Sequence, residues 1–577
     1  MTVPMLKASA LAAALALALS VGAQARSLSG AYLAGKSAEA RNDYAAAASY
    51  YGHALQRDPR NLPLRARTLR YTLLHGDLRA AASVAAPLAD QMPNDQLAAL
   101  ALIADDFRDG GFDDAVARLS AEDSPVTPLL AQLLTGWAEA GRGDAEAMEA
   151  AFGGLMEDPA ARVFALYNLG LARASLGDHA GAADALGEAL ETGASRDGRP
   201  VEALAAALEM SGRPDEARAA LTEAMSQGRA SPRLRAALAR MDAGESPAPL
   251  VLSARAGAAE TFHSFAGAIN TDRNRLVALL YARIALALRP ELDEARLLAG
   301  ALLLQLEAAD AAEIVYRGVA PASPLFPSAE IGRADALTDM DRLDEAVSAL
   351  TALAETSPED FAVQVSHASA LRRAERWEEA AAAYDAALAL VDPIETRHWA
   401  VFYERGIAHE RAGAWQEAEA DFFKALELEP DQPHVLNYLG YSWVEQRRNF
   451  DEAQEMIEKA VAQRPEDGYI TDSLGWVLYR VGKFEEAVPY LERAVELRPT
   501  DPIINDHLGD ALWMVGRTLE ANFQWRRALS FEPEDADAER IRRKLDVGLD
   551  RVLAEEAEAD AEAAADAAEP AAASDDG

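Results

Sequence analysis

Cysteine is absent from the 577-residue sequence. This absence excludes disulfide bonds, metal sites built on thiolates and a lipid anchor on a cysteine side chain. Aromatic residues are scarce, at 7% of the chain, although half of all residues are hydrophobic. No long alternation of polar and apolar residues predicts a β-strand. The composition therefore favours closely packed helices over a β-rich core.

Positive charge is also in short supply, since 55 lysines and arginines stand against 94 acidic residues and give a formal net charge of −39. Such a charge opposes binding to the phosphate backbone of nucleic acids. It equally opposes binding to anionic lipid surfaces. We therefore expect neither nucleic acid nor a membrane surface as a partner.

One long hydrophobic run is present, at residues 8–21. It follows Lys7 and precedes an A-x-A sequence that ends at Ala25. This order is typical of a signal peptide, so we expect residues 1–25 to be removed. The run is shorter than the ~20 residues that span a membrane, which makes an uncleaved anchor the less favoured alternative. If the source is Gram-negative, the mature protein is expected in the periplasm, without insertion into a membrane.

One pattern of residues recurs three times between positions 431 and 533. Each copy holds a Leu-Gly pair, two alanines and a proline, and the last two prolines each follow the previous one by 34 residues. Small residues suit the crossing of two helices, and proline ends the second helix. The shared positions are Leu439-Gly440, Leu474-Gly475 and Leu508-Gly509, Ala453, Ala487 and Ala521, Ala460, Ala494 and Ala528, and Pro465, Pro499 and Pro533.

This pattern resembles the tetratricopeptide repeat (TPR) family, whose 34-residue units each form two helices. Weaker copies cover most of the chain, so the resemblance implies an all-α superhelical solenoid of about fourteen helix pairs. The C-terminal repeats also resemble a narrower group, the bacterial envelope TPR scaffolds of carboxyl-terminal processing proteases and their cell-wall hydrolase substrates. Members of that group carry a lipidated cysteine, which this sequence lacks.

The repeat pattern breaks at residues 244–255, where two prolines occur without helical periodicity. We therefore predict an N-terminal solenoid at 26–243, a linker at 244–255 and a C-terminal solenoid at 256–533. Residues 534–553 are expected to form a capping helix, because Ile541, Leu545, Leu549 and Val552 recur at helical spacing. Residues 554–577 are acidic and contain no base, so we expect this tail to be disordered.

One enzyme motif matches by its letters. Gly30, Gly35, Lys36 and Ser37 fit the G-x-x-x-x-G-K-[ST] phosphate loop of nucleotide hydrolases. That loop needs a preceding strand and free backbone N–H groups, whereas Gly35 occupies the small position of a repeat helix. Nucleotide hydrolysis is thus the least favoured interpretation. We expect no enzymatic activity, no cofactor and no metal.

The first helix of each repeat presents positions 2, 5, 9 and 12 on one face, which we expect to line the inner groove. Aromatic side chains there could anchor a partner, and acidic ones would favour basic or apolar segments. Alternatively, neighbouring repeats or the tail cover these residues. In the last four repeats the predicted groove residues are Tyr403, Asn437, Tyr441, Tyr469, Asp472, Trp476, Tyr479, Asp506, Asp510 and Trp513.

Together these features predict an exported, non-enzymatic scaffold or adaptor that binds proteins along its groove. The narrower resemblance implies an envelope protease or a cell-wall hydrolase as the partner. The competing interpretation is a glycan-associated protein, whose aromatic groove stacks on sugar rings during polysaccharide export or cell-wall remodelling.

Overall fold

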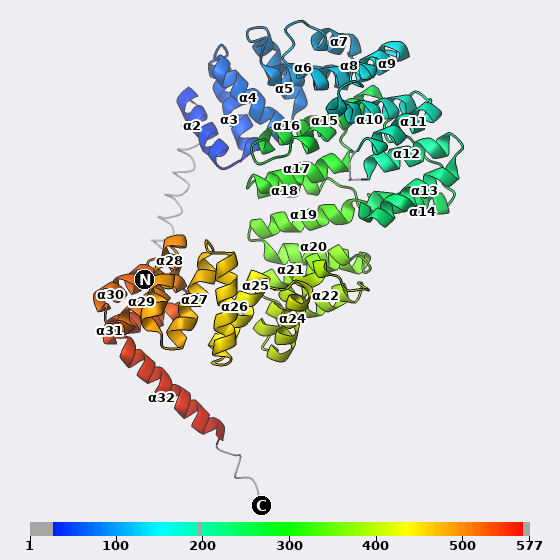
Figure 1. Cartoon of the computed structure of the whole chain (residues 1–577). Helices are drawn as coiled ribbons and strands as arrows, with labels where there is room; N and C mark the ends of the chain where they lie inside the picture. Colours follow the sequence, from blue (N-terminus) through cyan, green and yellow to red (C-terminus); the bar gives the residue numbers. More distant parts are fainter. Residues whose placement is uncertain (1–26, 194–197, 230, 569–577) are drawn as a thin grey trace, which may run out of the picture. The chain divides into compact units, whose positions relative to one another are not determined.

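The computed structural model describes residues 27–193, 198–229 and 231–568, and every regular element in these ranges is a helix (Figure 1). The predicted all-α solenoid is confirmed. The expected signal peptide lies outside the described residues. Among the described helices, none combines the length and apolarity needed to cross a bilayer. The chain divides into two compact units, of which unit 1 ends at Pro358 and unit 2 begins at Glu359.

Unit 1 contains nineteen described α-helices and one short π-helix. They are α2 (Leu28–Ala40), α3 (Tyr44–Arg57), α4 (Leu62–His75), α5 (Leu78–Ala89), α6 (Gln96–Asp109), α7 (Phe112–Leu119), α8 (Pro128–Arg142), α9 (Ala145–Gly153), α10 (Pro159–Ser175), α11 (His179–Glu191), α12 (Arg199–Met210), α13 (Pro214–Ala224), η1 (Met225–Arg229), α14 (Pro232–Asp242), α15 (Ala254–Ala268), α16 (Arg275–Leu288), α17 (Asp293–Gln305), α18 (Ala309–Tyr316), α19 (Phe326–Asp339) and α20 (Leu343–Thr356).

Unit 2 contains α21 (Phe361–Arg373), α22 (Trp377–Leu388), η2 (Thr396–His398), α23 (Trp399–Arg411), α24 (Trp415–Leu428), α25 (Pro433–Glu445), α26 (Phe450–Gln463), α27 (Gly468–Arg480), α28 (Phe484–Leu497), α29 (Pro502–Met514), α30 (Thr518–Leu529), α31 (Asp535–Val547) and α32 (Leu549–Ala568). Consecutive helices pair as antiparallel hairpins. Six hairpins precede α14, three follow it in unit 1, and five lie in unit 2 before α31. The expected number of about fourteen helix pairs is therefore met in the described ranges.

Small residues allow the two helices of a hairpin to cross closely. A Cβ atom added to Gly475 on α27 would lie 2.5 Å from Cγ of Leu491 on α28, and one added to Gly170 on α10 would lie 2.5 Å from Cγ of Leu186 on α11. Many helices begin at a side-chain cap, such as Asp43, whose Oδ1 accepts from the N–H of Ala46 at 2.9 Å. The local sequence thus sets both the helix ends and the crossing points.

In unit 1 the helices α15 and α16 lie against the first helices of the preceding hairpins (Figure 1). Helix α15 packs on α6, α8 and α10, and α16 packs on α4 and α6. The contact at α8 is very close, because a Cβ added to Gly257 would lie 2.2 Å from ring atoms of Trp137. Thr261 on α15 also donates to Asn168 Oδ1 on α10 at 2.8 Å. The inner face of this solenoid is therefore filled by the chain itself.

This packing corrects the predicted domain division. Residues 244–253 do form an irregular connection, but the helix that follows belongs to unit 1, and the units divide at Pro358. The two prolines indicate only where the helices stop. The tertiary contacts of α15 with α8 place α15 in unit 1. The spacing of the repeats in the sequence does not predict these contacts.

The C-terminal end also differs from the prediction. A single capping helix at 534–553 is replaced by α31 and α32, which Gly548 separates at a φ of 86°. Residues 554–568, expected to be disordered, belong to α32, and the rest of the tail lies outside the described residues. Arg543 donates to Glu555 at 2.8 Å, which holds α32 against α31. Alanine and glutamate are also strong helix formers.

Candidate functional site

Half of the residues predicted for the unit 2 groove are buried. They are Asp472, Trp476, Tyr479, Asp506 and Asp510. The interpretation of these residues as an open lining is wrong, because positions 5 and 9 of one first helix meet the next first helix. Tyr403, Asn437, Tyr441 and Trp513 are half-buried, and Tyr469 is exposed.

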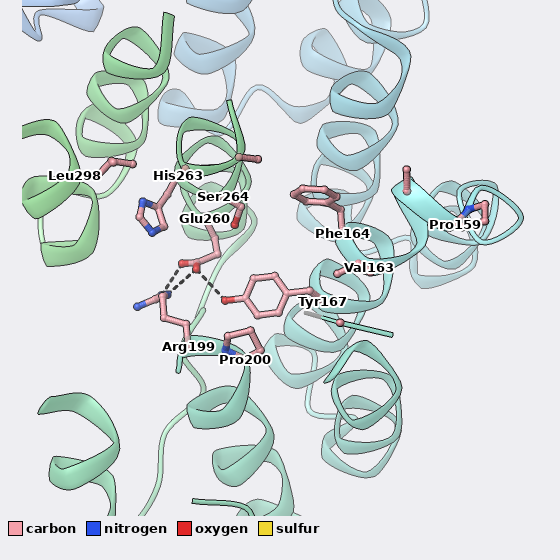
Figure 2. Close-up of a pocket in the computed structure, with 14 residues that line it drawn as sticks. Pro159, Val163, Phe164, Tyr167, Arg199, Pro200, Glu260, His263, Ser264 and Leu298 are labelled. Atoms are coloured by element: carbon pink, nitrogen blue, oxygen red, sulfur yellow. Dashed lines mark hydrogen bonds and ion pairs between the residues drawn. The ribbon is translucent and has the colours of Figure 1, made fainter. Parts of the chain in front are cut away.

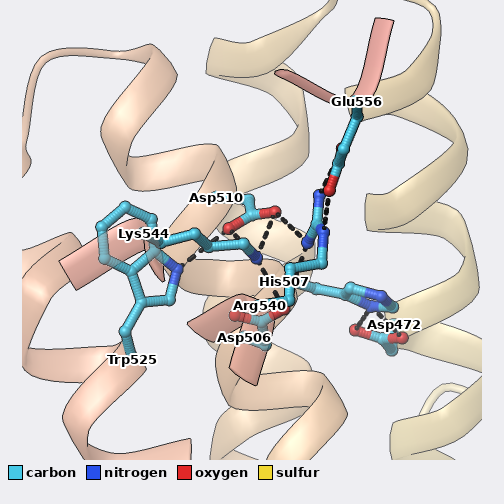
Figure 3. A network of polar contacts seen from close by, with 8 residues as sticks. All are labelled: Asp472, Asp506, His507, Asp510, Trp525, Arg540, Lys544 and Glu556. Atoms are coloured by element: carbon cyan, nitrogen blue, oxygen red, sulfur yellow. Dashed lines mark hydrogen bonds and ion pairs between the residues drawn. The ribbon is translucent and has the colours of Figure 1, made fainter. Parts of the chain in front are cut away.

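Figure 3 shows how α27, α29 and α31 meet. The Nδ1 atom of His507 lies 2.9 Å from Asp472 Oδ2, and its ring stacks on that of Trp476 with centroids 3.9 Å apart. Tyr479 stacks on the same indole, at 4.8 Å. The faces of Trp476 are thus used within the protein.

Where α31 packs against α29, the side chain of Lys544 inserts between two carboxylates of α29 (Figure 3). Its Nζ lies 2.7 Å from Asp506 Oδ2 and 2.6 Å from Asp510 Oδ1. Trp525 also donates to Asp510, at 2.9 Å. The Nε1–H of Trp513 donates to Asp550 at 3.1 Å. The C-terminal helices therefore cover the last predicted groove residues.

Burial and charge perturb two groups of this network. Burial and the neighbouring Asp510 raise the pKa of Asp506 to about 6, although Lys544 opposes the shift. Burial alone would lower the pKa of His507, but the charge of Asp472 and its hydrogen bond outweigh this effect and raise it.

Unit 1 keeps a pocket of about 660 Å³ where α15 meets α10 and α12 (Figure 2). Its apolar wall includes Val163 and Phe164 from α10, Pro200 from α12 and Leu298 from α17. Figure 2 shows Phe164 on one side and Leu298 on the other. Rim residues such as Pro159 are exposed, so the pocket reaches the surface.

A buried ionic network forms the polar end of this pocket (Figure 2). Arg199 donates to both carboxylate oxygens of Glu260, with Nε at 2.7 Å and Nη2 at 2.6 Å. The hydroxyl of Tyr167 donates to the same carboxylate at 2.9 Å. A second carboxylate, that of Glu294, accepts from Arg199 at 2.5 Å. These contacts tie α10, α12, α15 and α17 together.

The chemistry of Glu260 follows from these partners. Burial raises its pKa, but the charge and hydrogen bonds of Arg199 outweigh burial and lower the pKa to about 2. A carboxylate this acidic is a poor proton acceptor at neutral pH. Among the described residues, no cluster of three or more His, Asp or Glu side chains could hold a metal ion. The apolar wall of Val163, Phe164, Pro200 and Leu298 beside this network suits the binding of an apolar group.

The sequence contained a signal for this pocket. Tyr167 precedes Gly170 by three residues, as Asp472 precedes Gly475 and Asn437 precedes Gly440. Tyr167 therefore occupies a groove position of its repeat, although the groove residues predicted above lie only in the last four repeats. Glu260 lines the pocket because α15 packs against α8 and α10. The repeat pattern does not predict this packing.

The phosphate-loop match lies inside a helix. Residues 30–37 all belong to α2, where a Cβ added to Gly35 would lie 2.7 Å from the ring of Tyr51. Lys36 pairs with Glu39 at 3.4 Å within the same helix. These residues do not form the glycine-lined turn that a phosphate loop requires.

Comparisons with known proteins match the repeats. One tetratricopeptide repeat profile matches residues 331–393, 365–434 and 439–502, and another matches residues 164–192. The TPR repeat-containing protein PA4667 of Pseudomonas aeruginosa is 36% identical over 83 residues, which are 14% of each chain. These matches do not confirm the narrower resemblance to envelope protease scaffolds.

Two solved structures align with this chain at low sequence identity. A chain of the APC/C hetero-tetramer Cut9–Hcn1 aligns over 90% of this chain and 95% of its own, at 13% identity and a TM-score of 0.39. A tetratricopeptide repeat protein from Parabacteroides merdae aligns over 44% of this chain and 98% of its own, at 18% identity and a TM-score of 0.37.

Proposed function

We propose that this chain, whose helical hairpins are tetratricopeptide repeats, is a non-enzymatic scaffold that holds a protein partner in the pocket of unit 1. The observation that carries the proposal is an apolar, surface-reaching pocket in an inner face that α15 otherwise fills. Two hydrogen bonds between Arg199 and Glu260 hold the polar end of the pocket in one conformation, so the pocket has a fixed shape. Pockets that bind small ligands commonly have volumes of roughly 300–1,000 Å³, and the volume of this pocket, about 660 Å³, lies in that range.

The lining defines the chemistry of the partner. An apolar side chain such as leucine, methionine or phenylalanine fits between Phe164 and Leu298. His263 and Ser264 of α15 lie at the polar side of the same pocket, where they can contact the backbone of the inserted segment. The partner is therefore expected to present an apolar residue from an exposed segment.

We further propose that the protein acts in the cell envelope after export. The charged start, the apolar run at 8–21 and the A-x-A sequence ending at Ala25 support removal of residues 1–25. An envelope protease or a cell-wall hydrolase is the corresponding partner class. A mature protein whose first residue is Arg26, found in the periplasmic fraction, would support this location.

The glycan-associated alternative is less favoured by the arrangement in unit 2. Sugar stacking requires an accessible aromatic face, yet Trp476 is buried and stacks on both Tyr479 and His507. Of the predicted groove residues that the structure describes, only Tyr469 is exposed, and its phenol ring is a smaller platform than an indole.

The proposal is tested by photo-cross-linking in envelope fractions, with a benzophenone side chain at position 298 and mass spectrometry of the products. We expect a discrete protein product that Phe164→Ala diminishes about tenfold, as for a central interface anchor. The control Leu252→Ala changes a leucine of unit 1 that is 73% exposed and should leave the yield unchanged. Equal yields from all three proteins would contradict the proposal.

A further inference from the structure

A second pocket of unit 1, of about 570 Å³, lies where the first hairpin meets α16 and the α17–α18 loop. It is distinct from the pocket assigned to the protein partner. The Nδ2 atom of Asn42, between α2 and α3, donates to the carbonyl of Leu306 at 2.8 Å. This hydrogen bond joins segments 264 residues apart and fixes one edge of the pocket.

Arg283 of α16 lines this pocket. Its side chain passes Gly76, where an added Cβ would lie 3.8 Å from Nη1. The Nε–H is buried and has no hydrogen-bond partner. Among the described residues, no carboxylate lies within ion-pair distance of Arg283. Burial lowers the pKa of Arg283 to about 10, although Tyr44 opposes this shift, and Arg296 lowers the pKa further.

Tyr44 provides a second buried donor in the same pocket. It is only 4% exposed, and its hydroxyl has no hydrogen-bond partner. A buried donor without an acceptor is costly, and a buried cation without a counter-charge is more so. The two unsatisfied groups both require an acceptor, and an anion would satisfy them together.

The start of α18 adds to this environment. Its N-cap residue, Ala308, lines the pocket and cannot cap the helix with a side chain. The first turn of a helix carries partial positive charge and favours anions. The positive end of α18 and the cation of Arg283 therefore line one pocket.

We propose that this pocket binds a carboxylate, which accepts hydrogen bonds from Arg283 and Tyr44. The rim also carries the carboxylates Asp43, Glu307, Asp310 and Asp339. Asp43 is engaged as the cap of α3, and none of the four pairs with Arg283. Their charge repels a dianion more than a monoanion, which favours a carboxylate over phosphate.

Calorimetry and thermal unfolding of the full mature chain test this inference with N-acetylglycine and its neutral amide. Inorganic phosphate and chloride are compared at the same ionic strength. We expect saturable binding and a raised Tm with N-acetylglycine, and no response to the amide or to chloride. An equal response to the amide, or tighter binding of phosphate, would overturn the assignment.

Variants then locate the site. Arg283→Met should weaken N-acetylglycine binding at least tenfold, while its Tm without ligand stays equal to or above that of the parent. A purely structural arginine would instead give a lower Tm and no change in binding. Tyr44→Phe should weaken binding about threefold to tenfold, and this variant decides the question if Arg283→Met does not fold. The exposed Arg273→Met serves as the control.

Discussion

Lys544 of α31 lies 2.6 Å from Asp510 of α29, and its side chain is completely buried. This contact closes the last hairpin of unit 2 with a segment of the same chain. It also accounts for the carboxylates that the repeat pattern placed in an open groove. An inner face of a repeat solenoid cannot be taken as free before the segments outside the repeats are placed.

Removing that lysine should destabilise unit 2 strongly. Lys544→Met removes the nearest cation from the buried Asp506 and Asp510 and leaves them only Arg540, whose Nη1 lies 3.7 Å and 3.5 Å from them. Breaking a buried pair costs about 3–5 kcal/mol. We expect urea denaturation to show this loss of free energy of unfolding in the transition that involves α29 to α32. The exposed Lys459→Met should change the free energy of unfolding by less than about 0.5 kcal/mol. A similar small effect for Lys544→Met would refute the role given to this contact.

The same region should become more stable on mild acidification. The folded pKa of His507 is raised, so its contribution is complete below the unfolded value near 6.5 and declines as the pH rises through the folded pKa. Asp506 has a folded pKa of about 6, above its ordinary value, so the folded state gains stability as the pH falls from above 6 towards 4.

The measurement is the Tm of the transition of unit 2 between pH 8 and pH 5. His507→Gln and Asp506→Asn should each flatten its rise relative to the parent. The control His75→Gln changes an exposed histidine of unit 1 and should leave the profile as it is. Parallel profiles for all four proteins would show that general charge repulsion causes the effect.

The Arg199–Glu260 contact should show the opposite pH dependence. The folded pKa of Glu260 is lowered to about 2, so its stabilisation is present above its ordinary pKa and is lost as the pH falls towards 2. Glu260→Gln should destabilise unit 1 by about 3 kcal/mol at pH 7, and this difference should shrink between pH 5 and pH 3. As a control, Glu188→Gln breaks the half-exposed pair with Arg162 and should lower the free energy of unfolding by less than about 1 kcal/mol. A pH-independent effect of Glu260→Gln would contradict the assignment.

Substitutions at two glycines of α15 distinguish the effect of close packing on stability from the effect of helix propensity. Gly257→Val forces a side chain into Trp137, so we expect a loss of about 2 kcal/mol or more. Gly267→Ala meets no atom within 4 Å and should be neutral or stabilising by up to about 1 kcal/mol. Thermal unfolding of both variants makes the comparison. Equal effects would mean that α15 is not seated on α8 as described.

The repeats themselves could be predicted from the sequence, because Gly475 and Pro499 report contacts within about 34 residues of chain. The hairpin count and the small crossing residues follow from this local information. The burial of Trp476 and Asp510 could not be predicted in the same way. It depends on His507 and Lys544, which belong to the next helices and whose positions are set by tertiary packing.

The unit 1 pocket illustrates the same limit over a longer distance. Tyr167 occupies a repeat position that the sequence marks, but its partner Glu260 lies 93 residues further on. The irregular residues 244–253 suggested a boundary, whereas the chain uses them to return α15 to the inner face of unit 1. Proline content records the break in helix and gives no information about where the next helix docks.

The most direct test of the scaffold function is the Kd of the captured partner for three purified proteins, measured by calorimetry. They are the parent chain, Phe164→Ala and Leu252→Ala. The pocket in unit 1 predicts about tenfold weaker binding for Phe164→Ala and parental affinity for Leu252→Ala. Parental affinity for Phe164→Ala would contradict the assignment of this pocket as the partner site.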